Sequence, residues 1–231
     1  MKERPFVFIN SAMSADGKIS TTQRVQVRIS DDIDFDRVDD LRAGSDAIIV
    51  GIGTVLSDDP SLTVKSDERK KERVRRGEDE NPIRVVVDSR ARTPLDSDIL
   101  KKGNGRRIIF VSEAAPEEDV KALQCYSEVI SVGKDKVDLE DMLQKLGRMG
   151  VKRVMVEGGG TLNWAFLSGR LVDELYVYIG YFIMGGKGAP TLVDGGGFKV
   201  RPDMPELKLI DLQKMENGMV LRWRIGKRLP K

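Results

Sequence analysis

Short runs of β-branched and aliphatic residues alternate along the chain with longer stretches whose apolar positions recur at helical spacing. The short runs predict strands at 6–10, 47–51, 83–88, 107–112, 129–132 and 154–157. The longer stretches predict helices at 31–44, 116–123, 139–149 and 162–167. Alternation of this kind is typical of a mostly parallel sheet with helices on both faces.

The C-terminal part of the chain has a different pattern. Strands are predicted at 174–182, 206–214 and 219–225, with no helix between them. Leu175, Val177 and Ile179 alternate with polar positions, and Asn217-Gly218 is a hairpin turn signal. We therefore expect an α/β fold with antiparallel C-terminal strands, in a single domain spanning residues 1–231.

Two segments of this pattern need separate interpretation. In the helix at 31–44, Ser30 or Asp31 is the expected N-cap, Gly44 the C-cap, and the apolar stripe comprises Ile33, Val38 and Leu41. The charged run at 65–81 interleaves acids and bases. This favours a solvated surface loop over a phosphate or nucleic-acid patch.

Composition narrows the class of protein. The chain has 231 residues, of which 40% are hydrophobic and 33% charged, and a net charge of +2. This is the composition of a globular protein, and the small net charge argues against nucleic acid or a membrane as partner. A single cysteine, Cys125, and a short polar N-terminus without an apolar spanning run lead us to expect a cytoplasmic protein.

The chain has no histidine. Serine hydrolases with a histidine base, zinc sites with histidine ligands and histidine acids are therefore excluded, and one cysteine excludes a four-cysteine site. We expect no metal. Chemistry at neutral pH must then come from carboxylates, lysine, tyrosine, backbone groups or a cofactor.

The most informative motif is Glu157-Gly158-Gly159-Gly160-Thr161-Leu162, where a strand leads into a helix. Glycines let a phosphate approach the backbone, and the helix offers unpaired N–H groups and its positive end. The alternative is a tight turn that requires a positive φ. Because one glycine satisfies a turn, three in succession favour an anion site.

Polar residues also follow two other predicted strands. Thr54 and Asp58 suit a phosphate or ribose, or alternatively a helix cap and an Asp-Pro turn. Ser89, Arg90 and Arg92 suit the 2′-phosphate of NADP, or alternatively a surface turn with solvated arginines.

Segment 10–18, after the first strand, contains Asp16-Gly17-Lys18, which either faces a substrate or forms a simple turn. Glycine clusters at 185–188 and 195–197 fit connecting loops at least as well as ligand contacts.

Five stretches together resemble the pyrimidine reductase family of riboflavin biosynthesis. They are SAMSADGKIS, LRAGSDAIIVGIGTVLSDDPSLTV, PIRVVVDSRARTPL, VEGGGTLNWAF and GGKGAPTLVDGGGF, and they run from Asn10 to Phe198. The combination of GTVLSDDPSLT with EGGGTLN is specific. The resemblance implies a dihydrofolate-reductase-like fold and a homodimer.

The resemblance also implies a set of site residues. NADPH is expected at Thr54, Asp58, Ser89, Gly158, Gly159, Gly160, Thr161, Leu162 and Asn163, with Arg90 and Arg92 added for the 2′-phosphate. Substrate contacts are expected at Asn10, Arg42, Leu62, Lys65 and Glu157, and catalytic roles at Glu157 and Asp16. At Arg28 the chain departs from relatives that carry an aromatic residue at this cofactor-lining position.

The implied reaction is reduction by NADPH of the ribose side chain of 2,5-diamino-6-ribosylamino-4(3H)-pyrimidinone 5′-phosphate. We expect the stand-alone form of the enzyme, because the sequence begins almost directly with the first strand and has no zinc deaminase motif. Two alternatives remain: another pteridine- or nucleotide-linked NADPH reductase similar to dihydrofolate reductase, and a non-enzymatic NADP-sensing module.

Overall fold

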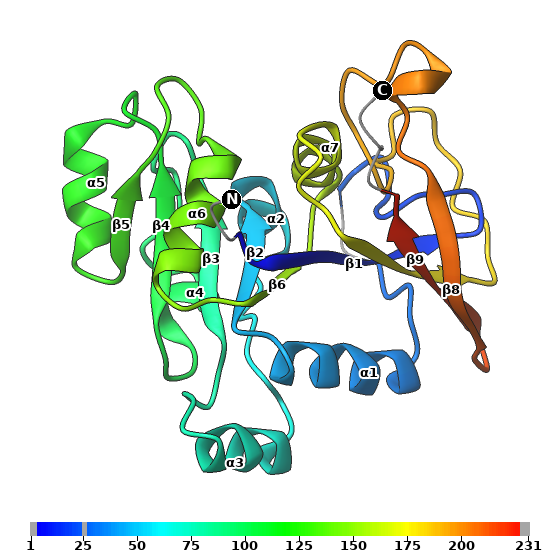
Figure 1. Ribbon diagram of the computed structural model, residues 1–231, viewed down its shortest axis with the longest axis horizontal. Coiled ribbons are helices and arrows are strands. Elements are labelled where there is room, and N and C mark those ends of the chain that lie inside the picture. Colours follow the sequence, from blue (N-terminus) through cyan, green and yellow to red (C-terminus); the bar gives the residue numbers. More distant parts are fainter. Residues whose placement is uncertain (1–3, 25–26, 227–231) are drawn as a thin grey trace. The chain divides into compact units, whose positions relative to one another are not determined.

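The computed structural model describes residues 4–24 and 27–226. Contacts within the chain group into two compact units. Unit 1 is built around Asp36–Glu157, and unit 2 combines Phe6–Phe35 with Gly158–Lys231. Each unit is described by itself (Figure 1).

Unit 1 contains a parallel five-stranded sheet. Its strands are β2 (Ala47–Gly51), β3 (Ile83–Val87), β4 (Arg107–Val111), β5 (Glu128–Ser131) and β6 (Arg153–Val156), in the order β5-β4-β3-β2-β6. Ile48, Ile49, Val85 and Ile108 are fully buried, as expected for strands covered on both faces. The predicted parallel sheet is confirmed.

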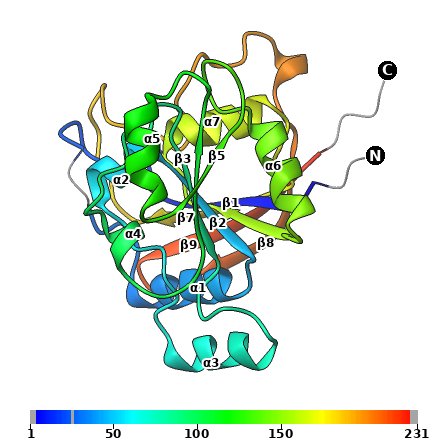
Figure 2. The ribbon, with the colours of Figure 1, turned by 90° about the vertical axis from the view of Figure 1, so that its left-hand side faces the viewer.

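Five helices belong to unit 1: α2 (Ile52–Asp58), α3 (Asp67–Arg75), α4 (Asp98–Lys101), α5 (Glu117–Gln124) and α6 (Leu139–Arg148). Figure 2 shows α2 and α4 on one side of the strands of unit 1 and α6 on the other. The carboxylate of Asp138 caps α6 by accepting the N–H groups of Glu140 and Asp141 at 2.9 and 3.0 Å. The apolar face of α6 buries Met142, Leu143 and Leu146.

The prediction of a loop throughout 65–81 is wrong, because α3 forms within it. Ser66 caps α3 by accepting from the N–H of Arg69. The Arg69 guanidinium binds both carboxylate oxygens of Asp36, at 2.6 and 2.8 Å. Buried Arg73 donates to the carbonyl oxygens of Ala43 and Ser45. Long-range pairing therefore uses charges that the local pattern assigns to solvent.

Unit 2 contains a mixed sheet. Strand β1 (Phe6–Ser14) pairs in parallel with β7 (Glu174–Gly180). Strand β7 pairs antiparallel with β9 (Gly218–Ile225), which pairs antiparallel with β8 (Leu207–Lys214). Helix α7 (Gly160–Ser168) and a short 3₁₀ turn (Arg201–Asp203) complete the unit. The antiparallel ending predicted from the alternation is confirmed.

Helix α1 (Asp32–Ala43) has an unexpected burial pattern. Ile33 and Phe35 are 54% and 49% exposed, whereas Asp34 and Asp39 are 1% and 6% exposed. Placing Ile33 in a buried stripe was therefore wrong. The buried acid Asp39 is satisfied by the backbone N–H groups of Lys65 and Ser66, at 2.5 and 3.0 Å.

No helix in the described part of the chain combines the length and apolar character needed to cross a bilayer.

Candidate functional site

In unit 1, three segments with predicted site residues leave the same edge of the sheet. Strands β3, β2 and β6 are parallel neighbours, so their carboxyl ends lie side by side. Helix α2 with Thr54 follows β2, the turn with Ser89 follows β3, and Glu157 follows β6. Ligands of open α/β sheets commonly bind at this edge.

An ion pair joins Glu157 to Arg42, which lies in the last turn of α1. Arg42 Nε donates to Glu157 Oε1 and NH2 donates to Oε2, both at 2.7 Å. The two side chains are 17% and 13% exposed. Two expected substrate-binding residues are thus in direct contact, in the two-bond geometry that guanidinium and carboxylate favour.

Arg42 is also tied to the segment that carries Lys65. Its NH1 donates to the carbonyl oxygen of Thr63 at 3.3 Å. Burial acts to lower the pKa of Arg42, but the charge and hydrogen bonds of Glu157 outweigh it and raise this pKa. Leu62 has a positive φ of 51° and is 1% exposed, so its side chain belongs to the core.

Lys65 lies beside this pair. Its Nζ donates to Ser61 Oγ at 2.9 Å and to Thr63 Oγ1 at 2.8 Å. Burial lowers the pKa of Lys65, and the positive charge of Arg42 lowers it further. Repulsion between two neighbouring cations would be relieved by an anion, so this arrangement is suited to a phosphate.

Thr54 lies in the first turn of α2, and Asp58 is the last residue of that helix. Thr54 is half-buried and Asp58 is exposed. Asp59 ends the helix in the left-handed region, with φ 42°, and its carboxylate accepts the N–H of Asp98 at 2.8 Å.

Asp88, which the sequence analysis did not single out, shapes the turn after β3. It is fully buried and accepts the N–H and Oγ1 of Thr93 at 2.7 and 2.9 Å. Around it, Arg90 donates to Ala114 O at 2.9 Å, and Arg92 Nε lies 3.5 Å from Asp88 Oδ1. Ser89 Oγ accepts the N–H of Val137. The position of Asp88, an acid at the end of a predicted buried strand, was the sequence signal that could have identified it.

In unit 2, the glycine junction precedes α7. Gly158 has φ 94°, and Gly159 is the N-cap, whose carbonyl oxygen accepts the N–H of Asn163 at 2.9 Å. No side chain caps this helix. The first-turn N–H groups of an α-helix have no acceptor within it, so those of α7 are suited to an anion.

Two of the three glycines have a purely structural reason. Gly158 requires the left-handed region, and a Cβ on Gly160 would overlap the carbonyl oxygen of Thr191. A structural reason for two of the glycines does not test the anion site, which stays a prediction. The helix terminus itself remains as support for that site.

The expected cofactor residues of α7 differ in exposure. Thr161 is exposed, Leu162 is 8% exposed, and Asn163 is fully buried. Asn163 Nδ2 donates to Leu192 O at 2.9 Å. Leu162 can thus serve a ligand through its backbone N–H but not through its side chain. Asn163, whose N–H is bonded to Gly159 O, can serve a ligand only indirectly.

Asp16 anchors a loop. Its carboxylate accepts Ser14 Oγ at 2.6 Å and the N–H groups of Met184 and Gly185 at 2.9 and 2.8 Å. The Ser14 hydroxyl, followed by the Met184 N–H, lowers its pKa to about 2. At neutral pH this group holds no proton to donate, so the expected proton-transfer role is not supported. Asn10, within β1, is 7% exposed.

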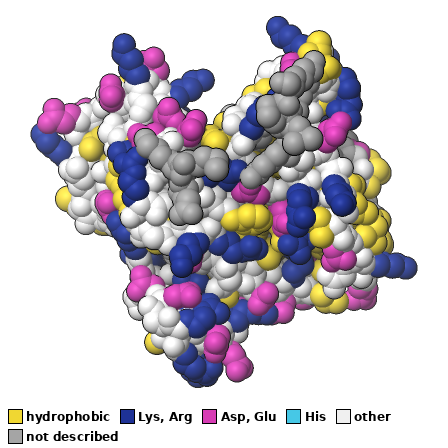
Figure 3. All heavy atoms as spheres, in the orientation of Figure 1, with side chains coloured by type: hydrophobic (Ala, Val, Ile, Leu, Met, Phe, Trp, Pro, Cys, Tyr) yellow, Lys and Arg dark blue, Asp and Glu magenta, His cyan; other side chains and the backbone are white. Residues whose placement is uncertain are grey.

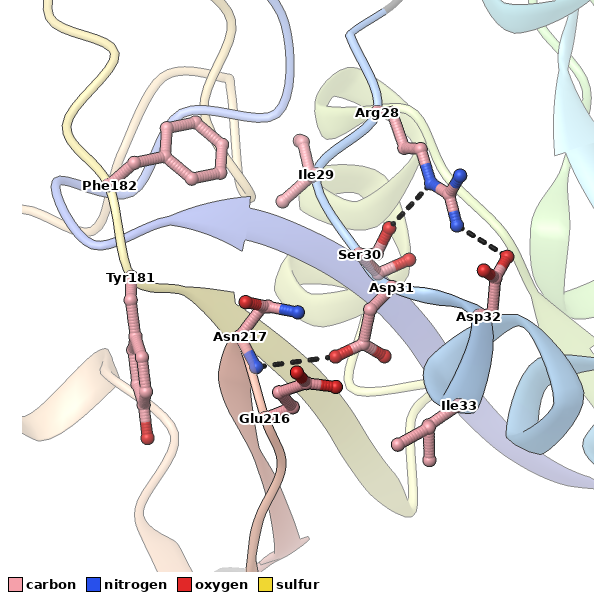
Figure 4. A pocket seen from close by; sticks show the side chains of 10 residues that line it. All are labelled: Arg28, Ile29, Ser30, Asp31, Asp32, Ile33, Tyr181, Phe182, Glu216 and Asn217. Carbon is pink, nitrogen blue, oxygen red and sulfur yellow. Dashed lines mark hydrogen bonds and ion pairs between the residues drawn. The ribbon is translucent and has the colours of Figure 1, made fainter.

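A pocket of about 520 Å³ in unit 2 was not anticipated from the sequence. Figure 4 shows it between the start of α1, the end of β7 and the β8–β9 turn. Arg28 at its edge pairs with Asp32 at 2.5 Å. Asp31 accepts the N–H groups of Asp34 and Asn217, at 2.9 and 3.4 Å. Arg28 is thus neutralised locally. No group of three or more potential metal ligands occurs within residues 4–24 and 27–226.

Comparison with known proteins identifies the family. A sequence profile of the RibD C-terminal domain matches residues 5–221. The 2,5-diamino-6-ribosylamino-4(3H)-pyrimidinone 5′-phosphate reductase of Archaeoglobus fulgidus is 51% identical over 224 residues, covering 97% of this chain and 100% of that protein.

Solved structures agree on the fold. Acinetobacter baumannii RibD has a TM-score of 0.80 at 25% identity, covering 97% of this chain and 59% of that one. Dihydrofolate reductase from Enterococcus faecalis has a TM-score of 0.50 at 10% identity, covering 96% and 97%. The predicted dihydrofolate-reductase-like α/β fold is confirmed, and the chain belongs to the RibD C-terminal domain family.

Proposed function

We propose that this protein reduces 2,5-diamino-6-ribosylamino-4(3H)-pyrimidinone 5′-phosphate to its ribitylamino product, with NADPH as the electron donor, in riboflavin biosynthesis. The full-length similarity to a reductase of that name carries the proposal. We also propose that residues 1–231 act as one reductase domain.

The substrate phosphate is assigned to Arg42 and Lys65. Their charges lie close enough for Arg42 to lower the pKa of Lys65. Arg42 uses Nε, one NH2 hydrogen and one NH1 hydrogen within the protein, which leaves two N–H donors for a ligand. A dianionic phosphate would stabilise both cations.

The chain has residues that fit a nicotinamide dinucleotide. The uncapped terminus of α7 in unit 2 suits the pyrophosphate, and exposed Arg90 and Arg92 in unit 1 suit a 2′-phosphate. Thr54 and Asp58 supply a hydroxyl and a carboxylate for ribose. The preference for NADPH over NADH depends on the two arginines.

When bound, the nicotinamide supplies a hydride. The ribosylamine first opens: the C1′–O4′ bond breaks, O4′ takes a proton, and the amine lone pair forms a protonated C1′=N bond. A cofactor held at the first turn of α7 would supply the hydride to C1′, with the C=N electron pair returning to nitrogen. Since this iminium is already a strong acceptor, the protein needs no histidine acid, and its main contribution is orientation.

Glu157 has the geometry to orient the opened sugar. Arg42 holds both of its oxygens, and each oxygen retains a second lone pair. These lone pairs would accept ribose hydroxyls or the substrate amine. Glu157 is thereby assigned to binding and positioning.

A spectrophotometric assay tests the proposal. Purified protein is mixed with NADPH or NADH and either the ribosylaminopyrimidine phosphate or dihydrofolate. We expect oxidation of NADPH with the pyrimidine only, and a lower kcat/KM with NADH. Oxidation with dihydrofolate would support the alternative reductase, and tight NADPH binding without turnover would support a sensing module.

We further propose that the protein is a homodimer that uses an apolar face formed by β8 and β9. On this face, the exposure of cross-strand neighbours increases from β7 through β9 to β8. Val177, Leu221 and Leu212 pair in one row and are 2% exposed, half-buried and 54% exposed. Leu175, Trp223 and Leu209 follow the same trend from 6% to 44%.

Figure 3 shows hydrophobic side chains over the region where Figure 1 draws β8 and β9. All eight residues of β8 are exposed. A second copy is the proposed occupant because a largely apolar face, with Lys214 at its end, can pair with itself across a two-fold axis.

A further inference from the structure

The loop 189–195, here called the clasp, closes over the first turn of α7. The N–H of Asp194 donates to the carbonyl oxygen of Gly160 at 3.0 Å. A side chain on Gly160 would overlap Thr191 O, and one on Gly195 would overlap the Trp164 ring. The clasp therefore lies in close contact with α7 at two positions one turn apart.

The clasp is held in shape by one threonine and one carboxylate. Thr191 donates its hydroxyl to Asp194 Oδ1 at 2.5 Å and its N–H to Asp194 Oδ2 at 3.0 Å. Both carboxylate oxygens are thus used within the loop. The carboxylate closes the loop so that the backbone N–H of Asp194 points at Gly160.

Asn163 fixes the other side of the contact. Its side chain is fully buried, and its Nδ2 donates to Leu192 O at 2.9 Å. Its Oδ1 is buried without a hydrogen-bond partner among the described residues. The same amide lies under Gly158, since a Cβ on that glycine would be 3.7 Å from Nδ2 and 3.9 Å from Oδ1.

Leaving a buried acceptor without a hydrogen bond is destabilising. A shorter apolar residue would avoid this cost but would remove the hydrogen bond to Leu192 O. What the amide provides is a link from the clasp, through α7, to the left-handed glycine at the junction.

The clasp is also tied to the turn after β1. The N–H of Ile19 donates to Pro190 O at 3.0 Å, and Lys18 Nζ donates to Ala189 O at 3.4 Å. The first turn of α7 is thus held from outside by a loop that has its own fixed support.

We propose that Thr191, Asp194 and Asn163 are positioning residues that hold the glycine junction in the conformation that binds the dinucleotide phosphate. This inference rests on the proposed function, because it requires the phosphate at α7. These side chains act through the backbone of 158–162 and touch no ligand. Backbone donors that are already fixed lose less entropy on binding, so the clasp should raise cofactor affinity.

The test compares Thr191→Val with Thr191→Ser. Valine keeps the shape and removes the hydroxyl donor, whereas serine keeps the donor. The Kd for NADPH is measured by fluorescence titration, together with kcat and both KM values. For Thr191→Val we expect about a fivefold weaker Kd, the factor that corresponds to one hydrogen bond of about 1 kcal/mol. We expect unchanged kcat at saturating NADPH and unchanged KM for the pyrimidine.

Thr191→Ser should bind NADPH like the wild type. A Thr191→Val protein with lower Tm but wild-type Kd would overturn the positioning role and leave only a structural one. Asp194→Asn, which places an amide N–H against one of the Thr191 donors, gives the same comparison should Thr191→Val not fold. Absence of NADPH binding by the wild-type protein would instead refute the proposed function itself.

Discussion

At the scale of single residues, the contact between Arg42 and Glu157 determines how the substrate site can work. Two expected substrate residues hold each other in a nearly buried ion pair. Each side chain is therefore needed to neutralise the charge of the other. Removing one leaves the other without its partner in a partly desolvated site, where an unpaired charge is costly.

Arg42→Ala should raise KM for the phosphorylated substrate by about 10- to 100-fold, the factor for a charge-assisted hydrogen bond of about 1.5–3 kcal/mol. Steady-state kinetics at saturating NADPH measure it. Arg75→Ala removes an arginine whose side chain is 65% exposed and should leave KM unchanged. A wild-type KM for Arg42→Ala would remove Arg42 from the phosphate site.

Deprotonation of Lys65 should weaken substrate binding at alkaline pH. Burial and the charge of Arg42 lower its pKa, so it loses its proton at a lower pH than an ordinary lysine. KM for the substrate should therefore rise as pH increases through this pKa. Lys65→Arg, which stays charged, should abolish the rise in a pH series of KM. The same alkaline rise in both proteins would contradict the assignment.

Some residue roles were readable from the sequence and others were not. Arg42, Lys65 and Glu157 were named from motif positions, and unit 1 brings them together. The anchoring role of Asp16 depends on N–H groups 168 and 169 positions away, and the contact at Gly160 depends on Thr191. Long-range contacts of this kind leave no signal in the local pattern.

At the scale of elements, strands were predicted better than charged helices. The parallel strands β2, β3 and β4 of unit 1 consist mostly of β-branched and aliphatic residues, a pattern that predicts buried strands directly. Helices α1 and α3 pair their charges with each other: Arg69 binds the exposed carboxylate of Asp36 and the buried carboxylate of Asp39. The helix predicted at 31–44 matches α1, whereas α3 was missed because its charges were assigned to a solvated loop. Arg84 is a further case: it is fully buried and donates to carbonyl oxygens between Ile99 and Gly105.

Asp31 should stabilise the start of α1. Its carboxylate accepts the N–H of Asp34 at 2.9 Å, a hydrogen bond that lowers the pKa of Asp31. Asp31→Ala should cost about 1 kcal/mol, or about 2–4 °C in Tm, whereas Asp31→Asn should retain most of the cap.

The stabilising contribution of Asp31 should decrease in acid. The folded pKa of Asp31 lies below its unfolded value, so its contribution is complete at neutral pH and is lost as pH falls through the folded pKa. Thermal melts from pH 7 to pH 2 should show wild type and Asp31→Ala converging in acid. A constant difference across this range would argue against the charge as its source.

At the scale of the whole molecule, strand β8 exposes a row of large apolar side chains. Leu207, Leu209, Ile210 and Leu212 on β8 are all at least 37% exposed. The alternation predicted the strand, but the chain alone does not say which strand of a sheet lies at its edge. The dimer is proposed because the apolar side chains of this edge strand are exposed.

Leu212→Glu should convert the dimer to a monomer, because it places a charge in a face that a partner would desolvate. Val74→Glu is the matched control, since Val74 has the same 54% exposure on α3. Light scattering after size exclusion should give about twice 25.8 kDa for the wild type and the control, and the single-chain mass for Leu212→Glu. A monomeric wild type at micromolar concentration would refute the dimer.

The buried carboxylate of Asp39 links Lys65 to α1, the helix that carries Arg42, so both residues proposed to bind phosphate are attached to the same helix. It grips the backbone of Lys65 from a point on α1 three residues before Arg42. Any small shift of α1 then carries both cations in the same direction. The positions of the two cations are therefore coupled through one carboxylate.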